Sequence, residues 1–421
     1  MPLKKIKHFL SGKFIQNVGW LGAAEIANRL FRVGTTVTLA RIFSTEDYGL
    51  MAQIYIIFDL SQVFTLKGGI AAKVIHTEES SLETICRTSY WLNWILCIGV
   101  FLLQLCVAWS LAYAQRSFEL GLQLSIVGLI YLMFPLYTIQ AALIERQNRL
   151  EVHAYCVAAY SFLSNFITIV LAVWGFGVWS IVWAMVISMP VWIVISRWQH
   201  PWRAPTQFRL DRWREVIRFG GNLLGVEILG TMRLNADYLI VRSFLGVEAL
   251  GLYYFAYNAG SGITSSILSK LMIPLFPYLC EVRTNSEAFK KRYWSSFKTV
   301  LLTMTPIVLL QASLAPWYVP IIFGAQWVPA IPILILICLA ILPITWGWLA
   351  TILLNAMDKT HIPLYFGVGY TGVFVIAILG AVRFQALGVA IAVLCSHFIG
   401  QSLFALGAHW YVFRKLKSQW S

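Results

Sequence analysis

Residues 327–355 read WVPAIPILILICLAILPITWGWLATILLN and contain no charged side chain. A helix of about 20 mostly apolar residues is long enough to cross the hydrocarbon core of a bilayer. A membrane-spanning strand would instead alternate apolar and polar positions over about ten residues. The stretch therefore predicts a membrane-spanning helix.

Similar apolar runs occur along the whole chain of 421 residues, of which 59% are hydrophobic and 12% are charged. Soluble domains carry about 25% charged residues, so this chain lacks the polar groups needed to cover a water-exposed surface. Mean hydropathy is +0.72. We expect an all-α polytopic membrane protein with twelve spans, at 18–42, 48–72, 88–113, 118–144, 152–173, 175–196, 219–244, 248–278, 295–322, 327–355, 361–382 and 385–412.

Lysine and arginine are distributed unevenly between alternate loops. With the N-terminus inside, 24 of these residues fall on the inner side and 4 on the outer side, at Arg41, Arg116, Arg242 and Arg383. Positive charge accumulates in cytoplasmic loops. We therefore expect both ends in the cytoplasm, as a leader over 1–17 without a signal-peptide pattern and a tail over 413–421.

The two halves of the chain resemble each other. Residues 41–50 read RIFSTEDYGL and residues 242–252 read RSFLGVEALGL, an offset of about 202 positions. Glu25 with Glu227, and Lys67 with Lys270, repeat at nearly the same offset. Parallel repeats are typical of transporters with a site between the halves. The expected domains are two pseudo-symmetric six-helix bundles around a central cavity, at 18–196 and 219–412, joined by a cytoplasmic linker at 197–218.

Ionisable side chains inside predicted spans are the candidate functional residues, because a charge at bilayer depth is costly unless it is paired or wet. In the first span, three such residues share an arc of about 60° on a helical projection. The seventh, second and eighth spans carry most of the others. The full set is Glu25, Arg29, Arg32, Asp59, Lys67, Glu227, Arg233, Asp237 and Lys270.

Two interpretations of these charges stay open. Arg29 with Glu25, and Arg233 with Asp237, are one turn apart and could neutralise each other, while the two lysines could extend to the cytoplasmic interface. Alternatively, the cations bind an anion, and the carboxylates orient them or carry ions. Arginine suits phosphate because its planar guanidinium donates two hydrogen bonds at once.

Several function classes are excluded. No nucleic-acid-binding motif, Walker A motif, Gly-x-Ser-x-Gly or His-Glu-x-x-His occurs, and the seven cysteines contain no Cys-x-x-Cys pair. We expect neither a metal site nor a catalytic residue. No outer loop exceeds roughly ten residues between the predicted spans, which disfavours an enzyme acting outside the membrane.

Three stretches resemble a known family. Residues 39–50, LARIFSTEDYGL, resemble the pattern LAR-x-LGPEDYGL of bacterial polysaccharide flippases, with Phe43-Ser44-Thr45 in place of Leu-Gly-Pro. Residues 235–253 and 323–332 resemble two further junctions of the same family. The chain is thus similar to the polysaccharide transporter family, with Wzx-type O-antigen flippases as relatives, in the multidrug/oligosaccharidyl-lipid/polysaccharide (MOP) exporter superfamily.

This resemblance implies a function. Such proteins move undecaprenyl-diphosphate-linked oligosaccharides of O-antigen, capsule or exopolysaccharide across the bacterial inner membrane, and they are not enzymes. It implies a lipid-linked glycan and membrane lipids as partners, beside the polymerase and chain-length machinery, in a monomer without cofactor except a coupling proton or sodium ion. The phosphate ligands would be Arg29, Arg32, Arg233, Lys67 and Lys270, and the ion-coupling residues Glu25, Asp59, Glu227 and Asp237.

Three alternatives stay open. A multidrug or metabolite exporter of the same superfamily would share the fold, but we expect it to have an acidic, aromatic cavity. A glycan polymerase or ligase would need a large outer loop. A non-transporting scaffold would not need charges at bilayer depth.

Overall fold

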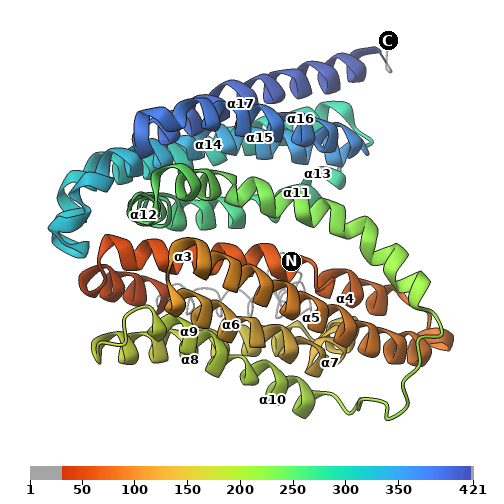
Figure 1. Ribbon diagram of the computed structural model, residues 1–421. Helices are drawn as coiled ribbons and strands as arrows, with labels where there is room; N and C mark the ends of the chain where they lie inside the picture. Colours follow the sequence, from red (N-terminus) through yellow and green to blue (C-terminus); the bar gives the residue numbers. More distant parts are fainter. Residues whose placement is uncertain (1–30, 419–421) are drawn as a thin grey trace, which may run out of the picture. The chain divides into compact units, whose positions relative to one another are not determined.

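In the computed structural model, the chain is described over residues 31–418, apart from the side chains at positions 222, 226, 263 and 415–418. Glu25, Arg29, the predicted leader and half of the first predicted span lie outside the described residues, and residues 31–42 are helical. Every regular element within the described range is a helix (Figure 1). The prediction of an all-helical protein is confirmed for this range.

The helices follow the predicted apolar runs. Those in the first part of the chain are α3 (Thr45–Val63), α4 (Lys67–His76), α5 (Glu79–Gln115), α6 (Phe118–Met133), η1 (Phe134–Leu136), α7 (Thr138–Arg146), α8 (Leu150–Val173), α9 (Trp179–Ser188) and α10 (Pro190–Gln199). The second part contains α11 (Trp213–Leu245), α12 (Val247–Met272), α13 (Leu275–Cys280), α14 (Ser286–Tyr318), η2 (Val319–Phe323), η3 (Ala325–Ala330), α15 (Ile331–Ala356), α16 (His361–Ala381), η4 (Val382–Phe384) and α17 (Gln385–Ser418).

Within the described range, the chain forms two compact units. The first comprises residues 31–43 and 53–232, and the second comprises residues 44–52 and 233–418. Two helices, α3 and α11, therefore contribute one end to each unit. The prediction of six-helix bundles at 18–196 and 219–412 stays a prediction.

The uncharged stretch at 327–355 supplies α15, which lies at the centre of the second unit. It packs against α12, α14 and α17, and Leu334, Cys338 and Leu349 are fully buried. A helix that is apolar on all sides is typical of such a central position, because each of its faces meets either protein or lipid. The core around it includes Leu268, Met304 and Phe404 from the neighbouring helices.

The first unit has its own core between α4, α5 and α7. Ile70 and Val74 of α4 pack with Ile85 of α5 and Ile139 of α7, and all four are buried. This cluster fixes the inner half of the second predicted span against its neighbours.

Three spans of the first unit are interrupted. The second predicted span breaks between α3 and α4, at residues 64–66, where Leu66 has a left-handed φ of 53°. Pro135 lies in η1 between α6 and α7, and Pro190 begins α10 directly after α9. Proline lacks the N–H that a helix interior requires and displaces the preceding turn, so the last two breaks follow from the sequence.

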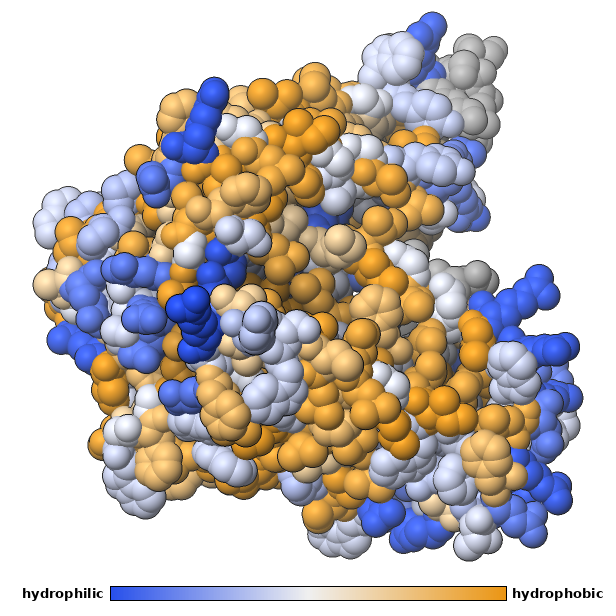
Figure 2. All heavy atoms as spheres, viewed as in Figure 1, coloured by the Kyte–Doolittle hydropathy of each residue, from blue (hydrophilic) through white to orange (hydrophobic). Residues whose placement is uncertain are grey.

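Eight described stretches are long and apolar enough to cross a membrane, or nine if the bent pair Val247–Gly262 and Thr264–Cys280 counts as one span. One of them, His361–Arg414, has 54 residues and contains two predicted spans separated by η4. Broad areas of the face shown in Figure 2 are covered by apolar side chains, with hydrophilic residues gathered in separate groups. The chain is therefore a multi-pass membrane protein, and the number twelve stays a prediction.

Two glycines that the repeat pairs across 202 positions, Gly49 and Gly251, bring α3 and α12 into close contact within the second unit. A methyl group at Gly49 would collide with the carbonyl group of Val247, and one at Gly251 would collide with the carbonyl group of Thr45. The contact is reciprocal, because Thr45 and Val247 are also 202 positions apart. Only glycine permits backbones to approach this closely.

Candidate functional site

The predicted charges of the first span are only partly placed. Arg32 lies on the helical stretch 31–42 and is exposed. Its backbone carbonyl accepts a hydrogen bond from Thr36 Oγ1 at 2.7 Å. Because Glu25 and Arg29 lie outside the described residues, the proposed charged arc of this span stays a prediction.

Glu227 lies beside Gly68, the residue that follows Lys67, in the first unit. Lys67 is the first residue of α4, and a methyl group at the adjacent Gly68 would lie 2.6 Å from Glu227 Oε1. On α11, Gly220 approaches α4 so closely that a methyl group at Gly69 would lie 2.6 Å from its Cα. These glycines allow the N-terminal half of α11 to place the Glu227 carboxylate beside the first turn of α4.

The Lys67 ammonium itself is directed into the first unit. Its Nζ donates a hydrogen bond to Tyr137 Oη at 2.6 Å. It also lies over the rings of Phe134, Tyr137 and Trp192, at 4.6, 4.8 and 5.8 Å from their centroids. We call these three residues the aromatic cage. In this structure Lys67 does not extend to an exposed interface, as one interpretation of the sequence allowed.

Asp59 lies on α3, in the outer half of the same predicted span. Its carboxylate accepts a hydrogen bond from Gln62 Nε2 at 3.0 Å and is half-buried. Nearby, Phe58 stacks on Tyr131, whose hydroxyl donates to Gln104 Oε1 at 2.6 Å. These contacts join α5 and α6 to α3 at Phe58, the residue before Asp59.

In the second unit, Asp237 and Arg233 do not pair with each other. Asp237 is buried and accepts hydrogen bonds from Tyr253 Oη and from the Tyr238 N–H, both at 2.9 Å. Arg233 is exposed, and no ion pair within residues 31–418 includes it. A methyl group at Gly367 of α16 would lie 3.6 Å from its Nη1. The interpretation in which Asp237 neutralises Arg233 does not describe this geometry.

Lys270, the repeat partner of Lys67, has a different environment. It lies in the last turn of α12 and is exposed. The helix ends shortly afterwards at Met272, before Pro274 begins the turn into α13. Two lysines that the sequence presents as equivalents are therefore caged in one unit and exposed in the other.

Sequence reasoning missed the tyrosines and the aromatic cage. Tyr253 and Tyr137 each contact a predicted charge through their hydroxyl groups. The sequence did contain a sign of the cage, because the helix-breaking residues Pro135 and Pro190 lie next to its rings. Within residues 31–418, no group of three or more His, Cys, Asp or Glu residues could hold a metal ion.

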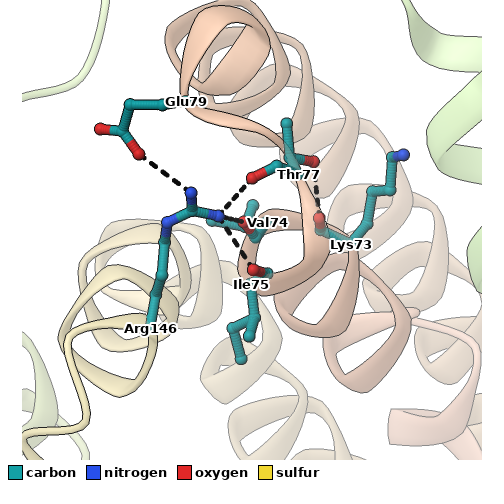
Figure 3. A network of polar contacts seen from close by, with 6 residues as sticks. All are labelled: Lys73, Val74, Ile75, Thr77, Glu79 and Arg146. Atoms are coloured by element: carbon teal, nitrogen blue, oxygen red, sulfur yellow. Dashed lines mark hydrogen bonds and ion pairs between the residues drawn. The ribbon is translucent and has the colours of Figure 1, made fainter.

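A second polar network, at the C-terminal end of α4, was also missed (Figure 3). Arg146 Nη1 donates to the carbonyl oxygens of Val74, Ile75 and Thr77, and its Nη2 pairs with Glu79 Oε2 at 2.9 Å. Carbonyl groups at a helix end have no partner within the helix. Arg146 of α7 supplies these partners and thereby fixes the end of α4.

The same arginine lines a cavity of about 420 Å³ in the first unit. His200 also lines it. Burial lowers the pKa of this imidazole, and the nearby positive charges of Arg149 and Arg203 lower it further. Outside the cavity, Lys73 Nζ donates to Glu215 Oε1 at 2.7 Å. These contacts stabilise the ends of α4, which begins at Lys67, and of α7, which follows Tyr137.

Comparison with known proteins places this arrangement in a family. The family model described as a polysaccharide biosynthesis protein matches residues 38–332. That range includes six of the nine candidate residues. It leaves out those of the first predicted span.

Two curated relatives match nearly the whole chain. The succinoglycan biosynthesis transport protein ExoT of Rhizobium meliloti is 25% identical over 412 residues, which are 95% of this chain and 80% of that protein. The lipopolysaccharide biosynthesis protein WzxC of Escherichia coli is 24% identical over 406 residues, which are 94% of this chain and 80% of that protein.

Solved structures show the same fold at low sequence identity. The lipid II flippase MurJ, in an inward closed conformation, superposes with a TM-score of 0.77 at 14% identity, covering 94% of this chain and 89% of that one. A multidrug resistance MATE family transporter of the MOP superfamily, in an inward-facing conformation, gives a TM-score of 0.68 at 14% identity and covers 94% and 96%.

The family model extends over more than half of the chain, and the folds of MurJ and of MATE transporters agree with it. The bundle carries its charges within long apolar helices, as a transport protein requires. The chain therefore belongs to the polysaccharide biosynthesis protein family, a family of membrane transporters rather than enzymes, and it shares its fold with MurJ and with MATE transporters of the MOP superfamily.

Proposed function

We propose that this protein is a flippase that moves an undecaprenyl-diphosphate-linked oligosaccharide from the inner to the outer leaflet of the bacterial inner membrane by alternating access. The oligosaccharide would be a repeat unit of O-antigen, capsule or exopolysaccharide. ExoT and WzxC are named for succinoglycan transport and lipopolysaccharide biosynthesis, which supports this substrate class.

The observation that carries the proposal is the state of Arg233. It is the twenty-first residue of α11, a helix of 33 residues, which at 1.5 Å per residue extends over about 50 Å. Its guanidinium is exposed and forms no ion pair among the described residues. An unneutralised guanidinium this far from both helix ends is costly unless it meets an anion or water, and a diphosphate is the anion that its planar fork fits.

The remaining predicted residues complete the proposal. Arg29, Arg32, Lys67 and Lys270 would contribute further positive charge to the diphosphate, and the polyprenyl tail would stay in lipid. This assignment also requires the predicted topology of twelve spans with both ends in the cytoplasm. Reporter fusions after the predicted spans test it, and an outward-facing N- or C-terminus would overturn it.

Deletion of the gene followed by analysis of lipid-linked glycans tests the function. The expected result is accumulation of a diphosphate-linked repeat unit on the inner leaflet, reversed by the wild-type gene and not by Arg233→Ala at equal protein level. Arg283→Ala is the matched control, because Arg283 is an exposed arginine of the same unit in an ion pair with Asp358 at 2.7 Å. Restoration of surface polysaccharide by Arg233→Ala would refute a role for this arginine.

We also propose that transport is coupled to a proton or sodium gradient through Glu25, Asp59, Glu227 or Asp237. The support is the location of three of these carboxylates on helices of the bundle, with Asp237 buried among tyrosines. Transport measured in vesicles should respond to one of the two gradients. Equal rates with both gradients collapsed would eliminate the coupling.

A further inference from the structure

Three helix breaks of the first unit meet at one side chain. Lys67 follows the break at residues 64–66 as the first residue of α4. Phe134 and Tyr137 flank the break at Pro135, and Trp192 follows Pro190 by two positions. Because Nζ of Lys67 contacts all three rings, one cation links the interruptions of three separate spans.

The cage that surrounds this cation is neutral. Its contacts are the faces of three aromatic rings and one phenol oxygen, and no ion pair among the described residues includes Lys67. Ring faces attract an ammonium group through their quadrupole. A carboxylate in the same place would cancel its charge. The cage therefore fixes the ammonium without a carboxylate among its described contacts.

The cage also fixes direction. Lysine has a flexible stem and three equivalent N–H donors, so an isolated lysine does not present its charge in one place. Tyr137 Oη takes one of these donors at 2.6 Å. Tyr137 and Phe134 are buried, and the rings of Tyr137 and Trp192 lie against each other with centroids 5.5 Å apart. The phenol is thus held rigidly by its own packing.

We propose that Tyr137, with Phe134 and Trp192, is a positioning residue that holds Lys67 in place for the diphosphate group of the lipid-linked substrate. This inference rests on the proposed function. Tyr137 acts through Lys67 and need not touch the substrate. Lys270, the repeat counterpart of Lys67, is exposed. The cage therefore makes the two lysines unequal in binding.

A double-mutant cycle in the full-length protein tests the proposal. The protein is reconstituted in nanodiscs and titrated with undecaprenyl diphosphate, and in parallel with neutral undecaprenol. Tyr137→Phe removes the phenol oxygen and keeps the ring, while Lys67→Met removes the charge and keeps much of the side-chain volume. The two single variants and their combination are compared at one salt concentration.

We expect Lys67→Met to weaken diphosphate binding about tenfold, as for the loss of one charge-assisted contact, and Tyr137→Phe to weaken it about threefold. The combined variant should bind no more weakly than Lys67→Met, because coupled residues are not additive. Tyr137→Phe combined with Lys270→Met should instead be additive, since the hydrogen bond of Tyr137 goes to Lys67 and not to Lys270. Binding of undecaprenol should not change in any variant.

Tyr131→Phe is the matched control. Tyr131 is buried in the same unit, and its hydroxyl donates to Gln104 rather than to Lys67. This variant should lower the unfolding temperature without changing diphosphate affinity. A purely structural role of Tyr137 predicts the same behaviour for Tyr137→Phe, and that result would overturn the inference.

Two outcomes separate this inference from the proposed function. If the wild-type protein binds undecaprenyl diphosphate no better than undecaprenol, both are wrong. If the wild-type protein prefers the diphosphate, while Tyr137→Phe binds it normally or is additive with Lys67→Met, only the positioning role is wrong.

Discussion

Gly251→Ala perturbs the contact between α3 and α12 at one defined point. The added methyl group would lie 2.9 Å from the backbone nitrogen of Gly49 and 2.9 Å from the carbonyl carbon of Thr45. Non-bonded atoms of this kind pack best at about 3.5–4.0 Å. The carbonyl oxygen of Thr45 would lie closer still. The two helices must therefore separate, because the atoms in the way belong to backbone and cannot rotate aside.

The change in stability caused by Gly251→Ala follows from two opposing effects. Overpacking of a tight interface costs about 3 kcal/mol at the upper end of its usual range. Replacement of glycine by alanine inside a helix returns about 1 kcal/mol, which leaves a net loss of about 2 kcal/mol. Gly262→Ala on the same helix is the matched control, since a methyl group there meets no atom of the described residues within 4 Å. It should gain about 1 kcal/mol, so the two variants should differ by about 3 kcal/mol.

Disulfide formation between Thr45→Cys and Glu248→Cys measures this contact directly. The side-chain oxygens of Thr45 and Glu248 are 3.3 Å apart in the structure, and the exposed Cys106 and Cys395 would first be replaced by serine. A loss of about 2 kcal/mol lowers the population of the closed contact about 30-fold relative to the separated helices. Cross-linking should slow accordingly with Gly251→Ala, and the unfolding temperature in detergent should fall.

The reasoning would be refuted if Gly251→Ala and Gly262→Ala had the same cross-linking rate and the same unfolding temperature. That result would mean that α3 and α12 do not approach at Gly251.

Two further predictions concern ion pairs near the C-terminal end of α4. Arg146→Ala should destabilise the protein by about 2 kcal/mol, because hydrogen bonds from a charged donor are worth about 1.5–3 kcal/mol and the carbonyl groups at the end of α4 lose theirs. Thermal unfolding measures this, and a midpoint unchanged from wild type would contradict it. The hydrogen bond from Lys73 lowers the pKa of Glu215 below its usual 4.5, so this pair stabilises the fold above about pH 4.5 and loses its contribution as the pH falls through the folded-state pKa. Unfolding of the wild type and of Glu215→Gln should therefore converge in acid, and a constant difference between them down to about pH 2 would refute the assignment.

Much of the fold could be predicted from the sequence because each membrane helix can be recognised from its own apolar run. Each apolar run needs only its own residues to satisfy its backbone hydrogen bonds, so the positions of α5, α8, α14 and α15 follow from the chain alone. Two of the breaks follow from Pro135 and Pro190. The break at residues 64–66 does not, since no proline is present and the left-handed Leu66 depends on its packing.

The candidate residues were found because charge in an apolar helix is conspicuous. Their partners were not found, because each lies on another element. Lys67 meets Tyr137 and Trp192, which are 70 and 125 positions away in the chain, and Asp237 meets Tyr253 rather than Arg233 one turn before it. Helical spacing offered Arg233 as one possible partner for Asp237, whereas in the structure the carboxylate accepts a hydrogen bond from Tyr253 of α12.

The sequence by itself determined that this chain crosses a membrane repeatedly as helices, that it belongs among polysaccharide transporters, and that Gly49 and Gly251 are equivalent positions. These properties reside in apolar runs, in motifs and in a repeat offset, all of which are local or linear. Only the tertiary structure decided that the equivalent glycines contact each other's helices, that Lys67 is caged while Lys270 is exposed, and that Arg233 is left without Asp237 as a partner. The physical reason is that a buried charge takes its nearest neighbour in space, and in a helical bundle that neighbour is set by how distant helices pack.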